Sequence, residues 1–216
     1  MDSKANDIIL VGGGGNCKVI IDLLSETSFN PIGILDPNLE KGSMFQGLSV
    51  LGTDDDAADI FESGVRKAVI TIAMPCSLKK RLAEQYSKIG FAFPTLISDS
   101  AIIAPSAKIG AGTCVMPGAN IGPDTIIGDQ STINVSSVVT HGITIDDYCN
   151  IAPNSTILGF VSVGESSLIG ANSVIVQCNN VGHDCIVGAG AVVLKDVEDG
   201  AVMVGNPAKV LRKAEH

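Results

Sequence analysis

Aromatic residues and positive charge are both scarce in this sequence. Aromatics make up 4% of its 216 residues, with no tryptophan, so a core built on packed rings is excluded. Hydrophobic residues nevertheless reach 45%, which favours a core of aliphatic side chains. Fourteen Lys and Arg stand against 23 Asp and Glu, a net charge of −9 that argues against nucleic acid or an anionic membrane as partner. A small anionic ligand stays possible, because it needs only local positive potential.

Long apolar runs and paired cysteines are also missing. The first six residues include no apolar run, and Ile8–Val11 is too short for a signal peptide or a membrane span. The six cysteines show no metal-type spacing, and Cys149 and Cys185 fall at positions where packing explains them. We therefore expect a reducing, cytoplasmic compartment and neither a metal site nor a membrane association.

A strict six-residue period fills the second half of the chain. Every sixth residue from Ile97 to Val193 is Ile or Val, without a change of phase. The fourth residue after each of them is mostly small, as in Ala119, Ser131 and Ser155. This period fits neither a helix nor an alternating strand, and it indicates a short strand plus a corner, with both residues pointing inward.

Glycine often follows the aliphatic residue of the repeat, as in Ile109-Gly110, Ile121-Gly122 and Ile169-Gly170. We interpret these glycines as corner residues with unusual backbone dihedrals.

Residues 1–96 show a different pattern. Strands are predicted at 7–11, 32–35 and 67–73, and helices after the glycine loop, at 54–63 with Asp54 as cap, and at 77–89 before Gly90. Alternating strands and helices predict a parallel α/β domain. The glycine run after the first strand suits a phosphate, and Asp36 ends the second strand, where such folds bind a ribose or base. The structural alternatives are that the glycine run is only a tight turn and that Asp36 is only a turn residue before Pro37.

The repeat resembles that of the hexapeptide-repeat acyltransferases, whose repeats wind a left-handed parallel β-helix. With the glycine-loop domain before it, the chain resembles the N-acetyltransferases of nucleotide-linked amino sugars and the sialic acid O-acetyltransferases. The resemblance implies a Rossmann-like α/β domain at 1–96 for the nucleotide sugar, a left-handed β-helix at 97–200 for acetyl-CoA, and a tail at 201–216 packed on the β-helix. It also implies a homotrimer with acetyl-CoA as co-substrate.

The resemblance assigns the nucleotide sugar to three segments of the first domain. The family loop G-A-G-G-H-G-K reads Gly12-Gly13-Gly14-Gly15-Asn16-Cys17-Lys18 here, so asparagine replaces its histidine. Asp36 matches the family's acidic residue, and Ala73 lies in the altered third-strand loop. The implied substrate-binding residues are Gly13, Gly14, Gly15, Asn16, Asp36 and Ala73.

The stretch from Ile133 to His141 resembles the family pattern I-N-x-S-x-V-x-H, with one residue more before the histidine. The resemblance implies a catalytic site at His141 and Asn134, with His141 as general base. His141 takes the third position of its repeat, which points outward, one coil from Pro123 and Gly159, where a ligand has room. The family's acidic residue after this histidine is Gly142 here. An ordinary surface histidine is the alternative.

The resemblance places the cofactor-binding residues Asn150, Ala171, Ala189 and Lys209 along the β-helix and its closing segment. Asn150 replaces a family histidine near the thioester, where an amide can still donate a hydrogen bond. Small residues admit pantetheine, and Lys209 suits the CoA phosphates. His183 and His216 are interpreted as a surface charge partner and a tail residue, and a shared zinc site is disfavoured.

The sequence therefore predicts an acetyl-CoA-dependent acetyltransferase of a nucleotide-linked amino sugar. The alternatives are O-acetylation of a sialic-acid-like sugar, and a non-catalytic β-helix scaffold or nucleotide-binding protein.

Overall fold

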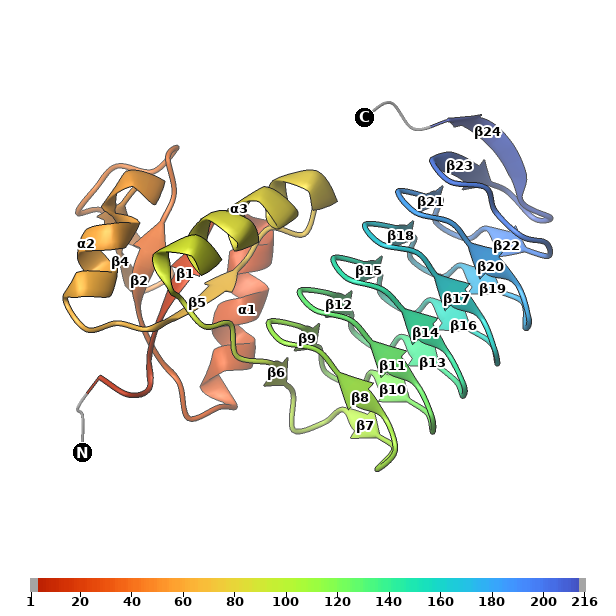
Figure 1. Ribbon diagram of the computed structural model, residues 1–216, viewed down its shortest axis with the longest axis horizontal. Coiled ribbons are helices and arrows are strands. Elements are labelled where there is room, and N and C mark those ends of the chain that lie inside the picture. The colour runs from red at the N-terminus through yellow and green to blue at the C-terminus, as the bar shows by residue number, and fades with distance from the viewer. Residues whose placement is uncertain (1–3, 214–216) are drawn as a thin grey trace. The chain divides into compact units, whose positions relative to one another are not determined.

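The computed structural model describes residues 4–213 and shows two compact units that divide after Leu96 (Figure 1). The last residues of the predicted tail, 214–216 with His216, lie outside the described part of the chain. No helix among the described residues is long and apolar enough to cross a membrane.

The first unit is an α/β domain with one five-stranded sheet in the order β3-β4-β2-β1-β5. Strands β4, β2, β1 and β5 run parallel, and β3 pairs antiparallel with β4. Its elements are β1 (Asp7–Val11), α1 (Gly15–Ser25), β2 (Asn30–Leu35), β3 (Met44–Phe45), β4 (Leu48–Gly52), the 3-10 turn η1 (Asp54–Asp56), α2 (Ala57–Glu62), β5 (Lys67–Ile70) and α3 (Cys76–Ile89).

Three sequence expectations for this domain need correction. Strands β3 and β4 were not predicted, and the last predicted strand ends at Ile70 rather than at residue 73. The cap at the second helical segment is Thr53, not Asp54, because Thr53 and Asp56 form a capping box around η1. The helix end at Gly90 is confirmed: Gly90 is left-handed and its N–H is bonded to the last helical carbonyls.

The second unit is the left-handed parallel β-helix, in which two-residue strands stack into three sheets. One sheet contains β7 (Ile102–Ile103), β10 (Asn120–Ile121), β13 (Val138–Val139), β16 (Thr156–Ile157), β19 (Val174–Ile175) and β22 (Val192–Val193). A second contains β8 (Lys108–Ile109), β11 (Ile126–Ile127), β14 (Thr144–Ile145), β17 (Ser162–Val163) and β20 (Asn180–Val181). The third contains β6 (Leu96–Ile97), β9 (Cys114–Val115), β12 (Thr132–Ile133), β15 (Asn150–Ile151), β18 (Leu168–Ile169), β21 (Ile186–Val187), β23 (Ala201–Val204) and, antiparallel to β23, β24 (Lys209–Lys213).

The six-residue period becomes the inner wall of this β-helix. From Val115 to Val193 every repeated Ile or Val is buried, and so is the residue four positions later, for example Ser131 and Ser155. Ile97, where the period starts, is 38% exposed because β6 is an edge strand of its sheet. Backbone N–H groups bond to carbonyls of the adjacent coil, so the coils satisfy one another.

The glycines after the aliphatic residue do not have the predicted unusual dihedrals. The left-handed corner residue comes two positions later, as at Ser136, Asn154 and Phe160. A Cβ atom on Gly170 would lie 2.5 Å from the carbonyl oxygen of Val187, so this glycine is needed because the next coil passes too close.

Candidate active site

His141 lies at the corner between β13 and β14, and its side chain is exposed, as its position in the repeat predicts. The ring reaches over the next coil, where Gly159 leaves it room: a Cβ atom on Gly159 would lie 2.6 Å from Nε2 of His141. The pair predicted one coil apart is thus in contact.

Phe160 packs against the same imidazole. The two rings are nearly perpendicular, at 88°, with centroids 5.1 Å apart. The N–H of Phe160 also donates to the carbonyl oxygen of His141 over 3.1 Å. Gly142 makes this possible, since a Cβ atom there would lie 2.8 Å from the Phe160 ring. Sequence reasoning missed Phe160, although its distance of three repeats from Gly142 places it directly above that glycine.

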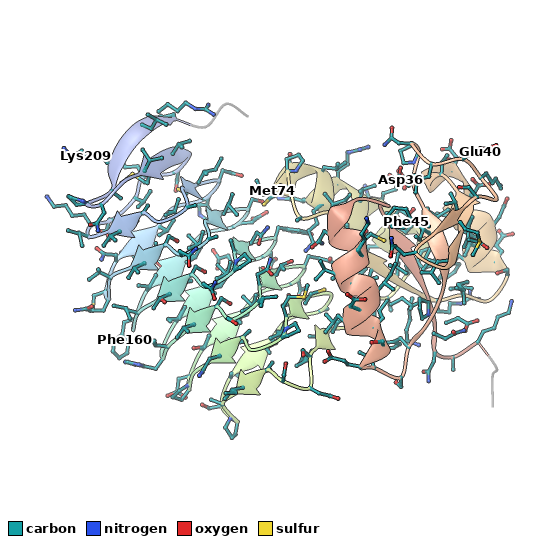
Figure 2. All side chains as sticks on the ribbon, turned by 180° about the vertical axis from the view of Figure 1, so that it is seen from behind. Asp36, Glu40, Phe45, Met74, Phe160 and Lys209 are labelled. Carbon is teal, nitrogen blue, oxygen red and sulfur yellow. The ribbon has the colours of Figure 1, made fainter. Side chains whose placement is uncertain are left out.

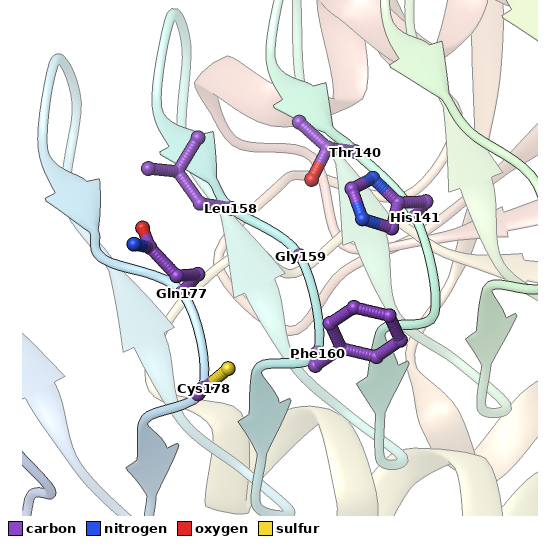
Figure 3. A pocket seen from close by; sticks show the side chains of 7 residues that line it. All are labelled: Thr140, His141, Leu158, Gly159, Phe160, Gln177 and Cys178. Carbon is purple, nitrogen blue, oxygen red and sulfur yellow. The ribbon is translucent and has the colours of Figure 1, made fainter.

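A cavity of about 450 Å³ opens beside the two rings (Figure 3). Figure 3 shows the His141 and Phe160 side chains on one side, and Leu158, Gln177 and Cys178 on the other. The lining consists of Thr140, His141, Leu158, Gly159, Phe160, Gln177 and Cys178. It is largely apolar and has few polar groups besides the imidazole, which suits a site where one proton acceptor faces a ligand.

The two described histidines are held in different ways. His183 occupies the same position of its repeat as His141, but its Nδ1 accepts the N–H of Glu165 from the preceding coil over 3.1 Å. In the preceding coil below His141 stands Pro123, which has no N–H to donate. Among residues 4–213 the His141 ring forms no hydrogen bond or ion pair, and Asp124 and Asp146, two carboxylates near it in the sequence, do not bond to it.

The acidic residues near His183 are not simple charge partners. Asp129 accepts the N–H of Ala111, and Asp147 accepts the N–H of Asp129 over 2.7 Å. Asp199 likewise accepts the N–H of His183 over 2.9 Å. These side chains tie successive coils together. Over the described residues no group of three or more His, Cys, Asp or Glu is placed to hold a metal ion.

The other predicted residues of the β-helix lie away from His141 within one chain. Asn134, Ala171 and Ala189 follow β12, β18 and β21, so they share the corner between the third sheet and the first, whereas His141 follows a strand of the first sheet. Asn134 shapes its own corner: its Oδ1 accepts the N–H of Val135 over 2.8 Å. Asn150 is buried on β15 between Thr132 and Leu168, and not at a corner.

Lys209, on the outside of β24, lines a second cavity of about 480 Å³ (Figure 2). Lys195 lines the same cavity and was not singled out by the sequence. Lys195 follows Val193 as Gln177 follows Ile175, so it continues the corner that carries His141 and Gly159. Two lysines at one hollow are suited to phosphate groups.

The glycine loop and Asp36 are joined by a hydrogen bond. Oδ2 of Asp36 accepts the N–H of Gly13 over 2.6 Å, and Oδ1 accepts the N–H of Asn38 over 2.7 Å. The N–H of Gly13 is therefore engaged, and a phosphate has to use the N–H groups of Gly14 to Asn16. The Nδ2 of Asn16 donates to the carbonyl oxygen of Thr71, which fixes the start of α1.

A cavity of about 190 Å³ lies at the carboxyl ends of β1 and β2 in this domain. Asp36, Asp54 and Arg81 are its charged residues, and the sequence did not single out Arg81. Asp54 accepts a hydrogen bond from the Tyr86 hydroxyl over 2.8 Å. Ala73, between β5 and α3, does not line this cavity.

Comparisons with known proteins cover both units. Residues 7–86 match the PglD N-terminal domain, and residues 124–159 match the bacterial transferase hexapeptide (six repeats). No curated protein sequence matches the chain.

Solved structures similar to this one span the whole chain. The H141N mutant of perosamine N-acetyltransferase from Caulobacter crescentus, in complex with CoA and GDP-perosamine, is 31% identical, with a TM-score of 0.93 over 97% of this chain and 98% of that one. The acetyltransferase domain of PglB from Neisseria gonorrhoeae, in complex with acetyl coenzyme A, is 29% identical, with a TM-score of 0.89 over 95% and 99%. WeeI from Acinetobacter baumannii is 27% identical, with a TM-score of 0.80 over 94% and 99%.

Proposed function

Because this chain belongs to the hexapeptide-repeat sugar N-acetyltransferases, we propose that His141 is the general base of an acetyl transfer from acetyl-CoA to the amino group of a nucleotide-linked sugar. The observation that carries the assignment is the His141 ring, which faces an apolar cavity and forms no hydrogen bond within the described residues. Relatives crystallised with CoA, acetyl coenzyme A and GDP-perosamine support the donor and the acceptor class.

The proposed reaction needs one proton acceptor. His141 takes a proton from the sugar amine, whose nitrogen attacks the carbonyl carbon of the acetyl thioester. The carbon–sulfur bond then breaks, and the proton passes to the departing thiolate, which leaves as CoA. A neutral imidazole is suited to this because it both accepts and returns a proton near pH 7.

We infer that CoA runs along the corner from His141 to Lys195. Gly159, Gln177 and Lys195 take the same position in the three following coils. Coils rise about 4.8 Å each, so the corner extends roughly 14 Å from the imidazole to the lysines. Lys195 and Lys209 receive the phosphates, and Gly159, which has no side chain, leaves room beside the imidazole near the thioester.

We also infer that the active site needs a second copy of the chain, in a homotrimer. Asn134, Ala171 and Ala189 occupy one corner and His141 another, so a ligand that contacts both sets lies between two chains. Coexpression of the His141→Ala and Ala189→Trp chains tests this. Mixed assemblies regain activity if the site is shared, and light scattering that shows a monomer contradicts the proposal.

The first unit is proposed to hold the nucleotide at the cavity of Asp36 and Arg81, with its phosphates near Gly14 to Asn16. Arg81 suits a diphosphate because its guanidinium binds two phosphate oxygens at once. The cytoplasmic location remains a prediction.

The decisive experiment compares two histidines. Thiol release from acetyl-CoA is measured with GDP-perosamine and with UDP- and dTDP-linked amino sugars as acceptors. His141→Asn is expected to lower kcat by roughly 10²–10⁴-fold while CoA binding persists. His183→Asn, at the equivalent repeat position on another corner, is the matched control and should keep kcat within about threefold. Full activity of His141→Asn contradicts the base assignment.

A further inference from the structure

Phe160 occupies a position that ordinarily holds a small or polar residue. It is the left-handed corner residue of its repeat, with φ +61°, and its side chain is 64% exposed. The equivalent corner positions mostly carry residues that tolerate this backbone or are polar: Asp124, Gln130, Ser136, Gly142, Asn154, Ser166, Asn172 and Asp184. Tyr148 and Cys178 are further exceptions. A bulky apolar ring there is unfavourable for both the backbone and its solvation, so local packing of the core does not account for it.

The contact made by Phe160 is directed at one imidazole. Its ring stands at 88° to that of His141, with centroids 5.1 Å apart, and both rings line the same cavity. Gly142, at φ +62°, provides the space, because any side chain there would begin 2.8 Å from the Phe160 ring. A carboxylate carried by residue 142 and the ring of Phe160 therefore exclude each other in this conformation.

Among the described residues the His141 ring lacks a hydrogen-bonded group that would orient it. No carboxylate, hydroxyl or amide bonds to its ring within the described residues. On the coil below, Pro123 offers no N–H, and on the coil above, Gly159 offers only backbone. The perpendicular ring of Phe160 packs against the imidazole, in a cavity that Thr140, Leu158 and Gln177 also line. Aromatic pairs at this separation and angle are favourable beyond their buried area and restrict rotation.

We propose that Phe160 is the positioning residue of His141: its ring holds the imidazole in the orientation in which it accepts the proton, a task performed by contact rather than by a hydrogen-bonded carboxylate. The inference rests on the proposed role of His141 and adds to it a residue that acts through it. Phe160 itself neither gives nor takes a proton.

The test is a series at residue 160 with steady-state kinetics for both substrates. Phe160→Leu keeps an apolar side chain without a ring and is expected to lower kcat about three- to tenfold, with both KM values within about twofold of the wild type. Phe160→Tyr keeps the ring and should restore kcat. Tyr148→Leu is the matched control, since Tyr148 is an aromatic at the same repeat position, also with positive φ, and lies away from His141. It should leave kcat unchanged.

A double-mutant cycle separates this inference from the function on which it rests. If Phe160 acts through His141, Phe160→Leu has no further effect on kcat in the His141→Asn background. A further loss there, an unchanged kcat in the single variant, or a raised KM with kcat preserved overturns the positioning role. High activity of His141→Asn by itself overturns the proposed base instead. Circular dichroism and thermal melting of each variant confirm that the β-helix is intact.

Discussion

The Nδ1 atom of His183 accepts the N–H of Glu165 from the coil below, 3.1 Å away. His141 has the same place in its repeat but accepts no such hydrogen bond. The residue one coil before it is Pro123, which has no N–H. One imidazole is fixed to the backbone, and the other extends over Gly159 and remains open to a ligand.

Pro123→Ala is therefore expected to weaken catalysis without touching the cavity. The new N–H competes for the His141 ring and draws it back as in His183. A neutral hydrogen bond contributes about 1 kcal/mol, so kcat should fall roughly fivefold. Pro105→Ala, one coil earlier in the same column, is the control and should have no effect. An unchanged kcat in both variants would show that the proline plays no part.

Asp36→Ala is expected to reduce nucleotide affinity at least about tenfold and to leave CoA affinity unchanged. Removing the carboxylate leaves the N–H groups of Gly13 and Asn38 without their acceptor, and the loop at the end of β1 loses its shape. Isothermal calorimetry with GDP, UDP and dTDP measures the effect. Equal affinity of wild type and variant for the preferred nucleotide would place the nucleotide elsewhere.

Cys178 is expected to report ligand binding at His141. It is exposed and lines the His141 cavity, whereas the other five cysteines are buried. N-ethylmaleimide at neutral pH should add one group, found at Cys178 by mass spectrometry and missing in Cys178→Ser. Prior addition of acetyl-CoA, whose sulfur is acylated and does not react with the maleimide, should slow the labelling severalfold. Labelling at the same rate with and without ligands argues that the cavity stays empty.

Stability should fall at alkaline pH because of Cys17. Burial raises the pKa of the Cys17 thiol to about 11, from a usual value of 9.0. The folded state therefore retains a proton that the unfolded chain releases, so the stabilisation is complete below pH 9 and is lost as the pH rises toward 11. Between these values the free energy of unfolding should decline by up to about 1.4 kcal/mol per pH unit, the slope for one proton released on unfolding.

Chemical denaturation at pH 7.5, 9 and 10 measures this decline. Cys17→Ala removes one titrating group and should make the decline shallower, leaving the part due to Cys185, whose thiol pKa is also raised by burial. Cys178→Ser should follow the wild type. The comparison stops at pH 10 because burial and the nearby Asp54 also raise the pKa of Tyr86, which adds its own decline at higher pH. An equal slope in all three proteins would contradict the assignment to Cys17.

The β-helix could be predicted from the sequence because the six-residue period fixes its register. An aliphatic residue every six positions leaves one way to bury them all, and the buried ladder from Val115 to Val193 follows it. Strands β3 and β4 escaped prediction because β3 has only two residues and the sequence of β4, LSVLG, does not alternate strictly between apolar and polar residues. The helix cap was predicted one residue too late, at Asp54 instead of Thr53, because the three acidic residues after Thr53 are themselves common cap residues.

The positions of site residues that follow from the repeat could be predicted from the sequence. The contacts that depend on side-chain conformation could not. The repeat placed His141 outward and Gly159 above it, as observed. It could not show that Phe160 turns its ring toward the imidazole, since that depends on a rotamer. The bond between Asp36 and Gly13 joins residues 23 positions apart and follows from the meeting of two strand ends.

Equivalent residues stack 18 positions apart, so the β-helix can change its length without changing its register only by multiples of 18 residues. Losing three repeats removes one whole coil and returns every later side chain to its own edge. Losing a single repeat rotates all later residues by about one third of a turn about the β-helix axis. Lys195 would then leave the corner that carries His141. Insertions and deletions that keep the later strands in register are therefore whole coils, and an insertion of any other length has to leave the β-helix as a loop at a corner.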